Sequence, residues 1–162
     1  MKFEKFLKNC GARGSVVNTP GGQFLKLGAV MLAIPAGLNV LSTTTTESPQ
    51  YIDDIFTDFD DEFLIKAELS GAQLPTPDAS PSKIQRIFTN EQGGTIAIDN
   101  KTFSIIERAD RIYTFRENED GAADDQDALV ITTGYGDDEQ ITGIILDEQY
   151  YYNKLTNKED NK

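Results

Sequence analysis

Apolar residues recur at helical spacing at the start of the chain. Phe3, Phe6 and Leu7 fall on one side of a helix, with lysine and glutamate residues between them. This pattern predicts a short amphipathic helix that ends at Gly11. About nine residues do not hold a helix alone in water. We therefore expect the apolar side of this helix to pack on the rest of the fold or on another chain.

The segment that follows has an extended pattern. Ser15–Asn18 and Gln23–Ile34 are candidate strands on either side of the turn 19–22. The uncharged run 42–46 is either a strand or an extended linker. Residues 1–47 are thus predicted to form a helix and an arm or hairpin, which is apolar, rich in glycine and in need of a partner to bury it. Its candidate interface residues are Phe3, Phe6, Leu7, Phe24, Leu27 and Met31.

A second helical pattern lies within residues 48–73. Five apolar side chains between Ile52 and Phe63 follow helical spacing, which predicts a helix over 50–66 with an acidic outer face. The acidic residues at 58 and 60–62 raise the alternative of a calcium site. An EF-hand loop requires a central glycine, which this segment lacks, so we interpret the acids as a solvated face and predict no metal site.

The pattern changes after a proline-rich connector at 74–82. Three prolines in seven residues predict an extended segment that joins neither a sheet nor a helix. Residues 83–155 then show short alternating runs separated by turn residues, as in small sandwiches and barrels. Residues 99–101 are interpreted as a hairpin turn. The expected strands are 83–90, 95–98, 102–108, 111–115, 128–133 and 141–146.

The predicted fold class is mainly β with minor α (α+β). It consists of a small antiparallel β-barrel or sandwich, preceded by an N-terminal arm and an acidic amphipathic helix. The acidic segment 117–127 is expected to be a surface loop, and 156–162 a polar tail. The consecutive residues Tyr150, Tyr151 and Tyr152 do not all point to one face, so at least one should be exposed. They are either a protein interface or a core edge with one hydrated hydroxyl.

Charge is distributed unevenly along the sequence. The net charge is −12; residues 1–50 carry +3 and residues 51–162 carry −15. An acidic body repels phosphate, so its bulk is not expected to grip nucleic acid. Three uses of the charge remain open: solubility, the lining of a passage through which DNA slides, and imitation of DNA. The basic N-terminal segment is either a solvated helix or a surface that docks on an acidic neighbour.

Composition excludes several kinds of chemistry. The absence of histidine rules out a Ser-His-Asp triad, and the single Cys10 rules out an internal disulfide. No base or orienting partner can be named for Cys10, and the many carboxylates single out no acid–base pair. The longest apolar run, Leu27–Ile34, is far shorter than the ~20 residues of a membrane span. We predict no catalytic residues, no cofactor and no membrane partner, and the charged start makes a secretory signal unexpected.

One stretch resembles a known class of proteins. Gly94–Arg108 reads as a hydrophobic strand, then Asp-Asn-Lys-Thr-Phe, then a second hydrophobic strand. It resembles the first β-hairpin of small β-barrel proteins from tailed-phage necks, of the stopper and head-completion type. The connector 74–81 and the glycine-rich arm are similar in style to small phage virion proteins. The resemblance extends over residues 83–146, and no functional residue carries over from it.

The resemblance implies a ring-forming, non-enzymatic virion component, assembled in the host cytoplasm. Its partners would be portal, adaptor or capsid proteins, and its ring would surround the DNA channel with passive contact to DNA. The expected function is therefore a head–tail connector or neck component of a tailed bacteriophage. The alternatives are a capsid decoration protein and an acidic inhibitor that imitates DNA, while an enzyme is disfavoured because no site is identifiable.

Overall fold

A single mixed β-sheet dominates the structure, a computed structural model that describes residues 1–38, 40, 44–57, 64–75, 84–115 and 127–147. Its strands are β1 (Ser15–Thr19), β2 (Gly22–Leu27), β3 (Val30–Ala33), β4 (Thr45–Glu47), β5 (Leu64–Pro75), β6 (Ile84–Asn90), β7 (Thr95–Asp99), β8 (Arg111–Phe115), β9 (Ala128–Thr133) and β10 (Gln140–Leu146). They lie in the order β4-β1-β2-β3-β10-β9-β8-β5-β6-β7. β1 and β4 are parallel, and the other described neighbours are antiparallel.

The middle strands of the sheet are buried on both faces. Successive side chains of a strand point to opposite faces, so an unbroken apolar run indicates burial on both sides. In β9, Leu129 and Ile131 belong to one buried cluster, which we call the first core. Ala128 and Val130 between them belong to another, the second core. The same alternation holds in β3 and β10.

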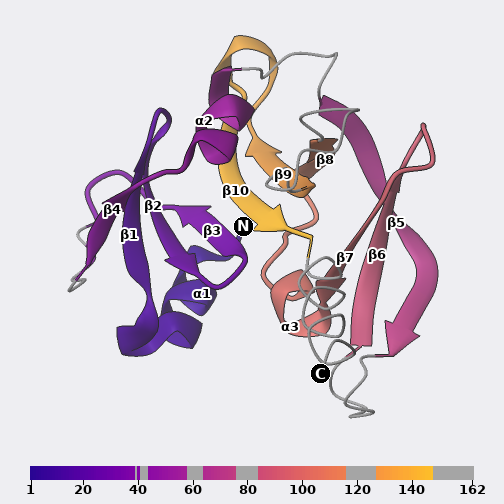
Figure 1. Cartoon of the computed structure of the whole chain (residues 1–162), viewed down its shortest axis with the longest axis horizontal. Coiled ribbons are helices and arrows are strands. Elements are labelled where there is room, and N and C mark those ends of the chain that lie inside the picture. The colour runs from indigo at the N-terminus through magenta and orange to yellow at the C-terminus, as the bar shows by residue number, and fades with distance from the viewer. Residues whose placement is uncertain (39, 41–43, 58–63, 76–83, 116–126, 148–162) are drawn as a thin grey trace, which may run out of the picture.

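Each core is completed by different elements. Helix α1 (Phe3–Cys10) and strands β6 and β7 pack on the first core, to which Phe6 and Phe88 contribute buried rings. Helix α2 (Gln50–Thr57) covers the second core with Ile52 and Ile55. The shorter helices are η1 (Gly11–Arg13), α3 (Asn100–Phe103) and η2 (Gly136–Asp138). Figure 1 shows β8, β9 and β10 between β1–β4 on one side and β5–β7 on the other.

The expected class, mainly β with minor α, is confirmed, as are the first helix and the strands near 84–90, 95–99, 111–115, 128–133 and 140–146. The segment predicted as Gln23–Ile34 divides into β2 and β3, because Gly28 adopts a positive φ of 59° and turns the chain. The run 42–46, left open as strand or linker, contributes β4.

The arrangement of the opening third differs from the expectation. β3 pairs with β10, with Met31 opposite Ile144, so strands from the predicted arm and from the predicted β-rich half share one sheet. This third is buried by the chain's own strands and helices. The expectation that it needs another polypeptide for burial is wrong, because its apolar runs fill both faces of the sheet.

The second helix is shorter than predicted, and the connector is partly a strand. Helix α2 ends at Thr57, and by Leu64 the chain has entered β5, which pairs with β8. β5 continues through Leu74 and Pro75, which lie opposite Gln85 and Ile84 at the strand's end. Proline is tolerated at such a position, so the prediction that this part joins no sheet is wrong. Residues 76–82 lie outside the described residues.

The prediction of a hairpin turn at residues 99–101 is also wrong. β7 pairs with β6, and the chain then enters α3 instead of a strand over 102–108. The carboxylate of Asp99 accepts a hydrogen bond of 2.6 Å from the backbone N–H of Thr102. This N-cap makes a helical turn more favourable than a hairpin turn. The stretch that carried the resemblance to phage neck proteins therefore contains one strand and a helix.

Candidate functional site at the β9–β10 hairpin

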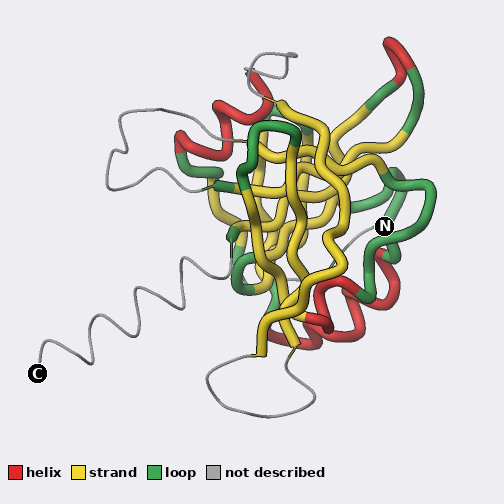
Figure 2. Tube along the Cα trace, turned by 90° about the vertical axis from the view of Figure 1, so that its right-hand side faces the viewer, coloured by secondary structure: helices red, strands yellow, loops and turns green. Residues whose placement is uncertain are grey.

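The hairpin between β9 and β10 projects from one end of the molecule, with η2 at its tip (Figure 2). Gly134 and Gly136 adopt positive φ angles of 95° and 58°. The backbone N–H of Asp138 donates to the carbonyl of Tyr135 at 3.1 Å, and that of Glu139 donates to the carbonyl of Gly136 at 3.2 Å. The tip is therefore an ordered turn held by its own backbone.

Glu139 is the centre of a polar cluster at the base of this hairpin. Its Oε1 accepts hydrogen bonds from the Tyr113 hydroxyl at 2.9 Å and from Thr132 Oγ1 at 2.6 Å. Arg111 places Nη1 3.7 Å from the same oxygen. Hydrogen bonds to an ionised group are stronger than neutral ones. The cluster thus ties β8 and β9 to the residue that leads into β10.

An exposed aromatic ring stands on this cluster. The guanidinium carbon of Arg111 lies 4.5 Å from the centroid of the Tyr135 ring, which is a cation–π contact. Tyr135 is 80% exposed, compared with 44% for Leu69 and 42% for Leu38. Arg111 therefore contacts the ring, while most of the ring surface faces solvent. Aromatic anchors at protein interfaces have this arrangement.

The environment of Tyr113 makes its hydroxyl a weak acid. Burial raises the pKa of Tyr113 above 10, and the hydrogen bond and negative charge of Glu139 raise it further, against a smaller opposing effect of Arg111. The phenol is therefore protonated near neutral pH and acts as the hydrogen-bond donor to Glu139. The cluster is suited to fixing a surface rather than to transferring protons.

The N-terminal ammonium forms a second polar site, near the first core. Met1 N lies 2.9 Å from Asp110 Oδ1 and 3.0 Å from Glu107 Oε2. Burial lowers the pKa of this ammonium, but the hydrogen bonds and charges of Asp110 and Glu107 outweigh it and raise the pKa above 8. The backbone N–H of Lys2 also donates to the carbonyl of Ile105 at 2.8 Å. These contacts fix the start of α1 against the turn that follows α3.

A hollow beside α1 has both charged and apolar lining residues, and the apolar ones are Phe3, Pro35 and Leu38. The lysines of α1 and Glu4 surround it, and the full lining is Lys2, Phe3, Glu4, Lys5, Lys8, Pro35 and Leu38. Lys2, Lys5 and Lys8 are exposed, so the hollow has a net positive rim. We refer to it below as the lysine hollow.

The interface residues expected from the sequence are mostly inside the protein. Phe3, Phe6, Phe24 and Met31 are buried in the two cores, so they offer no exposed interface in this fold. Leu7 and Leu27 are partly buried against the first core. Tyr150, Tyr151 and Tyr152 lie outside the described residues. Phe24 is enclosed because its ring meets Phe56 of α2 edge to face, with centroids 5.7 Å apart.

Sequence reasoning missed the hairpin tip. The segment between the expected strands 128–133 and 141–146 was interpreted only as turn residues, and Tyr135 within it was overlooked. An aromatic residue in an acidic, glycine-rich turn has no apolar neighbours in sequence to cover it, and this was the available signal. The pairing of Arg111 with Glu139 links two strands and was not predictable from spacing.

The single cysteine is not placed as a reactive group. Cys10 is a free thiol and is buried, and burial raises its pKa although Arg13 and Lys101 oppose this. A raised pKa keeps the thiol protonated and poorly nucleophilic.

Within the described ranges, no three acidic or thiol side chains gather closely enough to hold a metal ion. None of the helices in the described part of the chain has the length and apolar character to cross a membrane.

Comparisons with known proteins do not assign the chain to a family. No known protein family, curated protein or solved structure matches the chain.

Proposed function

We propose that this chain is a structural assembly protein whose binding surface is the tip of the β9–β10 hairpin. The observation that carries the proposal is the Tyr135 ring, which is largely exposed yet fixed by Arg111. An aromatic side chain held in place before binding loses little conformational freedom when a partner covers it. The acids beside it, Asp137 and Asp138, are exposed and give the tip a negative charge.

The specific form that we propose is a virion component of a tailed bacteriophage, in the head–tail connector or neck, assembled in the host cytoplasm. A decoration protein on the capsid surface is the alternative within the same class. Strong negative charge on the body suits a part that stands near DNA without gripping it. The proposal assigns no catalytic step to the chain, and its partners are other virion proteins and further copies of itself.

Replacement of Tyr135 by alanine tests this proposal. The protein is mixed with portal, adaptor and capsid proteins of a tailed phage, and complexes are measured by light scattering. Tyr135→Ala should weaken co-assembly at least tenfold, because buried aromatic anchors contribute about 2 kcal/mol or more. Leu69→Ala, which removes another exposed apolar side chain, is the matched control and should bind like the unmodified chain.

The proposal is contradicted if no phage head or neck protein forms a complex with the unmodified chain. It is also contradicted if the chain displaces DNA from a nuclease or polymerase in a salt-sensitive manner, which would favour an inhibitor that imitates DNA.

A further inference from the structure

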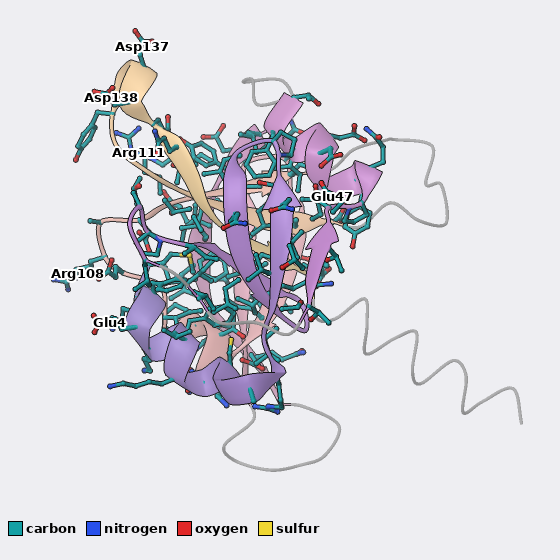
Figure 3. All side chains as sticks on the ribbon, turned by 90° about the vertical axis from the view of Figure 1, so that its left-hand side faces the viewer. Glu4, Glu47, Arg108, Arg111, Asp137 and Asp138 are labelled. Atoms are coloured by element: carbon teal, nitrogen blue, oxygen red, sulfur yellow. The ribbon has the colours of Figure 1, made fainter. Side chains whose placement is uncertain are left out.

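The hairpin tip and the lysine hollow lie well apart on the molecule. Figure 3 shows Asp137 and Asp138 at the tip of the hairpin, at the top of the view, and Glu4 on α1 well below them on the same side. A contact between the tip and the lysine hollow within one chain is therefore excluded. If the two meet, they meet between chains.

The tip and the hollow are complementary in charge. The tip presents two exposed carboxylates, Asp137 and Asp138, whereas the rim of the hollow carries three lysines and one glutamate. Opposite charges on facing surfaces steer association and fix its register. Most of the protein is acidic and would repel Asp137 and Asp138. The lysines that line the hollow would attract them.

They are also complementary in apolar character. The apolar lining residues of the hollow are Leu38 and Pro35, which are exposed, and Phe3, which is buried. The tip has one large apolar group to place there, the Tyr135 ring. Burial of an aromatic ring against such side chains, with charged groups at the rim, is the usual composition of an interface centre.

From these observations, we infer that the hairpin tip of one copy of this chain inserts Tyr135 into the lysine hollow of a second copy. Asp137 and Asp138 then pair with the lysines of α1 at the rim. The two surfaces are different, so the contact is heterologous, and a pair of copies still has one free tip and one free hollow. Repetition of the contact yields a closed ring or an open filament. This inference rests on the proposed function, for which it names the partner.

Two complementary charge reversals test the contact. Lys5→Glu/Lys8→Glu destroys the hollow and leaves the tip intact, whereas Asp137→Lys/Asp138→Lys destroys the tip and leaves the hollow intact. Each variant alone should associate at least tenfold more weakly than the unmodified chain and sediment near the monomer mass of 17.9 kDa. An equimolar mixture should regain association above the monomer mass, because the intact tip of one variant meets the intact hollow of the other, and the reversed tip and reversed hollow are again opposite in charge. This rescue also shows that both variants are folded.

Matched controls carry the same changes of charge at other exposed positions. Lys66→Glu makes the same kind of change as the first variant, and Glu68→Lys/Glu91→Lys matches the second. Both controls should associate like the unmodified chain. The inference is overturned if the controls lose association equally, if the mixture regains no association, or if the unmodified chain stays monomeric at every concentration. In that last case, co-assembly with phage proteins through Tyr135 would leave the proposed function standing, whereas no co-assembly would remove both.

Discussion

Glu139 shows at the scale of a single residue how the candidate surface is built. One carboxylate oxygen accepts hydrogen bonds from Tyr113 and Thr132 and faces the guanidinium of Arg111. Thr132 is fully buried, so its hydroxyl depends on this partner within the fold. The exposed Tyr135 ring then lies on Arg111. The position of the proposed contact residue thus follows from a carboxylate that lies mostly out of solvent.

Substitution of Glu139 should change the ionisation of Tyr113. Glu139→Gln keeps an oxygen that accepts hydrogen bonds but removes the negative charge, so the pKa of Tyr113 should fall toward 10. Titration of the labelled tyrosine ring by NMR measures this pKa directly. Tyr135→Phe is the control and should leave the pKa of Tyr113 in place, because it keeps the ring on Arg111. An unchanged pKa in Glu139→Gln would show that burial alone sets it.

The same substitution has a consequence for stability at high pH. Because the folded-state pKa of Tyr113 is raised, its contribution to stability is complete below pH 10 and is lost as pH rises through the folded pKa. The free energy of unfolding of the unmodified chain should therefore fall above pH 10. In Glu139→Gln this part of the fall should be smaller, as measured by urea unfolding across the range.

At the scale of elements, the tip of the β9–β10 hairpin depends on one glycine. A Cβ at Gly134 would lie 2.4 Å from the carbonyl oxygen of Asp138, and the backbone there has φ of 95°. Gly134→Ala should destabilise the protein by about 1–3 kcal/mol more than Gly136→Ala, through overpacking against backbone. Gly136 is a matched control, since it also has a positive φ but no heavy atom lies within 4 Å of its added Cβ. Equal losses in urea unfolding would contradict this account of the turn.

The elements also show what the sequence could and could not predict. Strands such as Arg111–Phe115 and Ala128–Thr133 were predictable because periodicity and turn residues are local signals. The helix after β7 was missed because one side-chain cap, from Asp99, decides between two kinds of turn. The pairing of β3 with β10 was missed because residues more than a hundred positions apart carry no local signal of their contact.

The candidate site was less predictable than the fold, for the same reason. Sequence reasoning selected apolar residues of the opening third, such as Phe24 and Met31, because it took apolar character for exposure to a partner. Apolar runs are equally the signature of strands buried on both faces, which is their role here. The exposed Tyr135 ring contacts Arg111, which in turn faces Glu139, and only the folded chain brings these residues together.

At the scale of the whole molecule, the acidic and the basic surface features lie far apart. The acidic hairpin tip projects at the top of the view in Figure 3, and α1 with its exposed lysines lies well below it. The first core connects them, since it contains residues of α1 as well as of β9 and β10. The inferred contact between copies rests on this separation of an acidic surface from a basic one.

Sedimentation equilibrium of the unmodified chain over a range of concentrations tests this account most directly. We predict an apparent mass that rises above 17.9 kDa with concentration and returns toward it in 1 M salt, where charges are screened beyond about 3 Å. A mass of 17.9 kDa at every concentration and salt level would contradict association between the tip and the hollow.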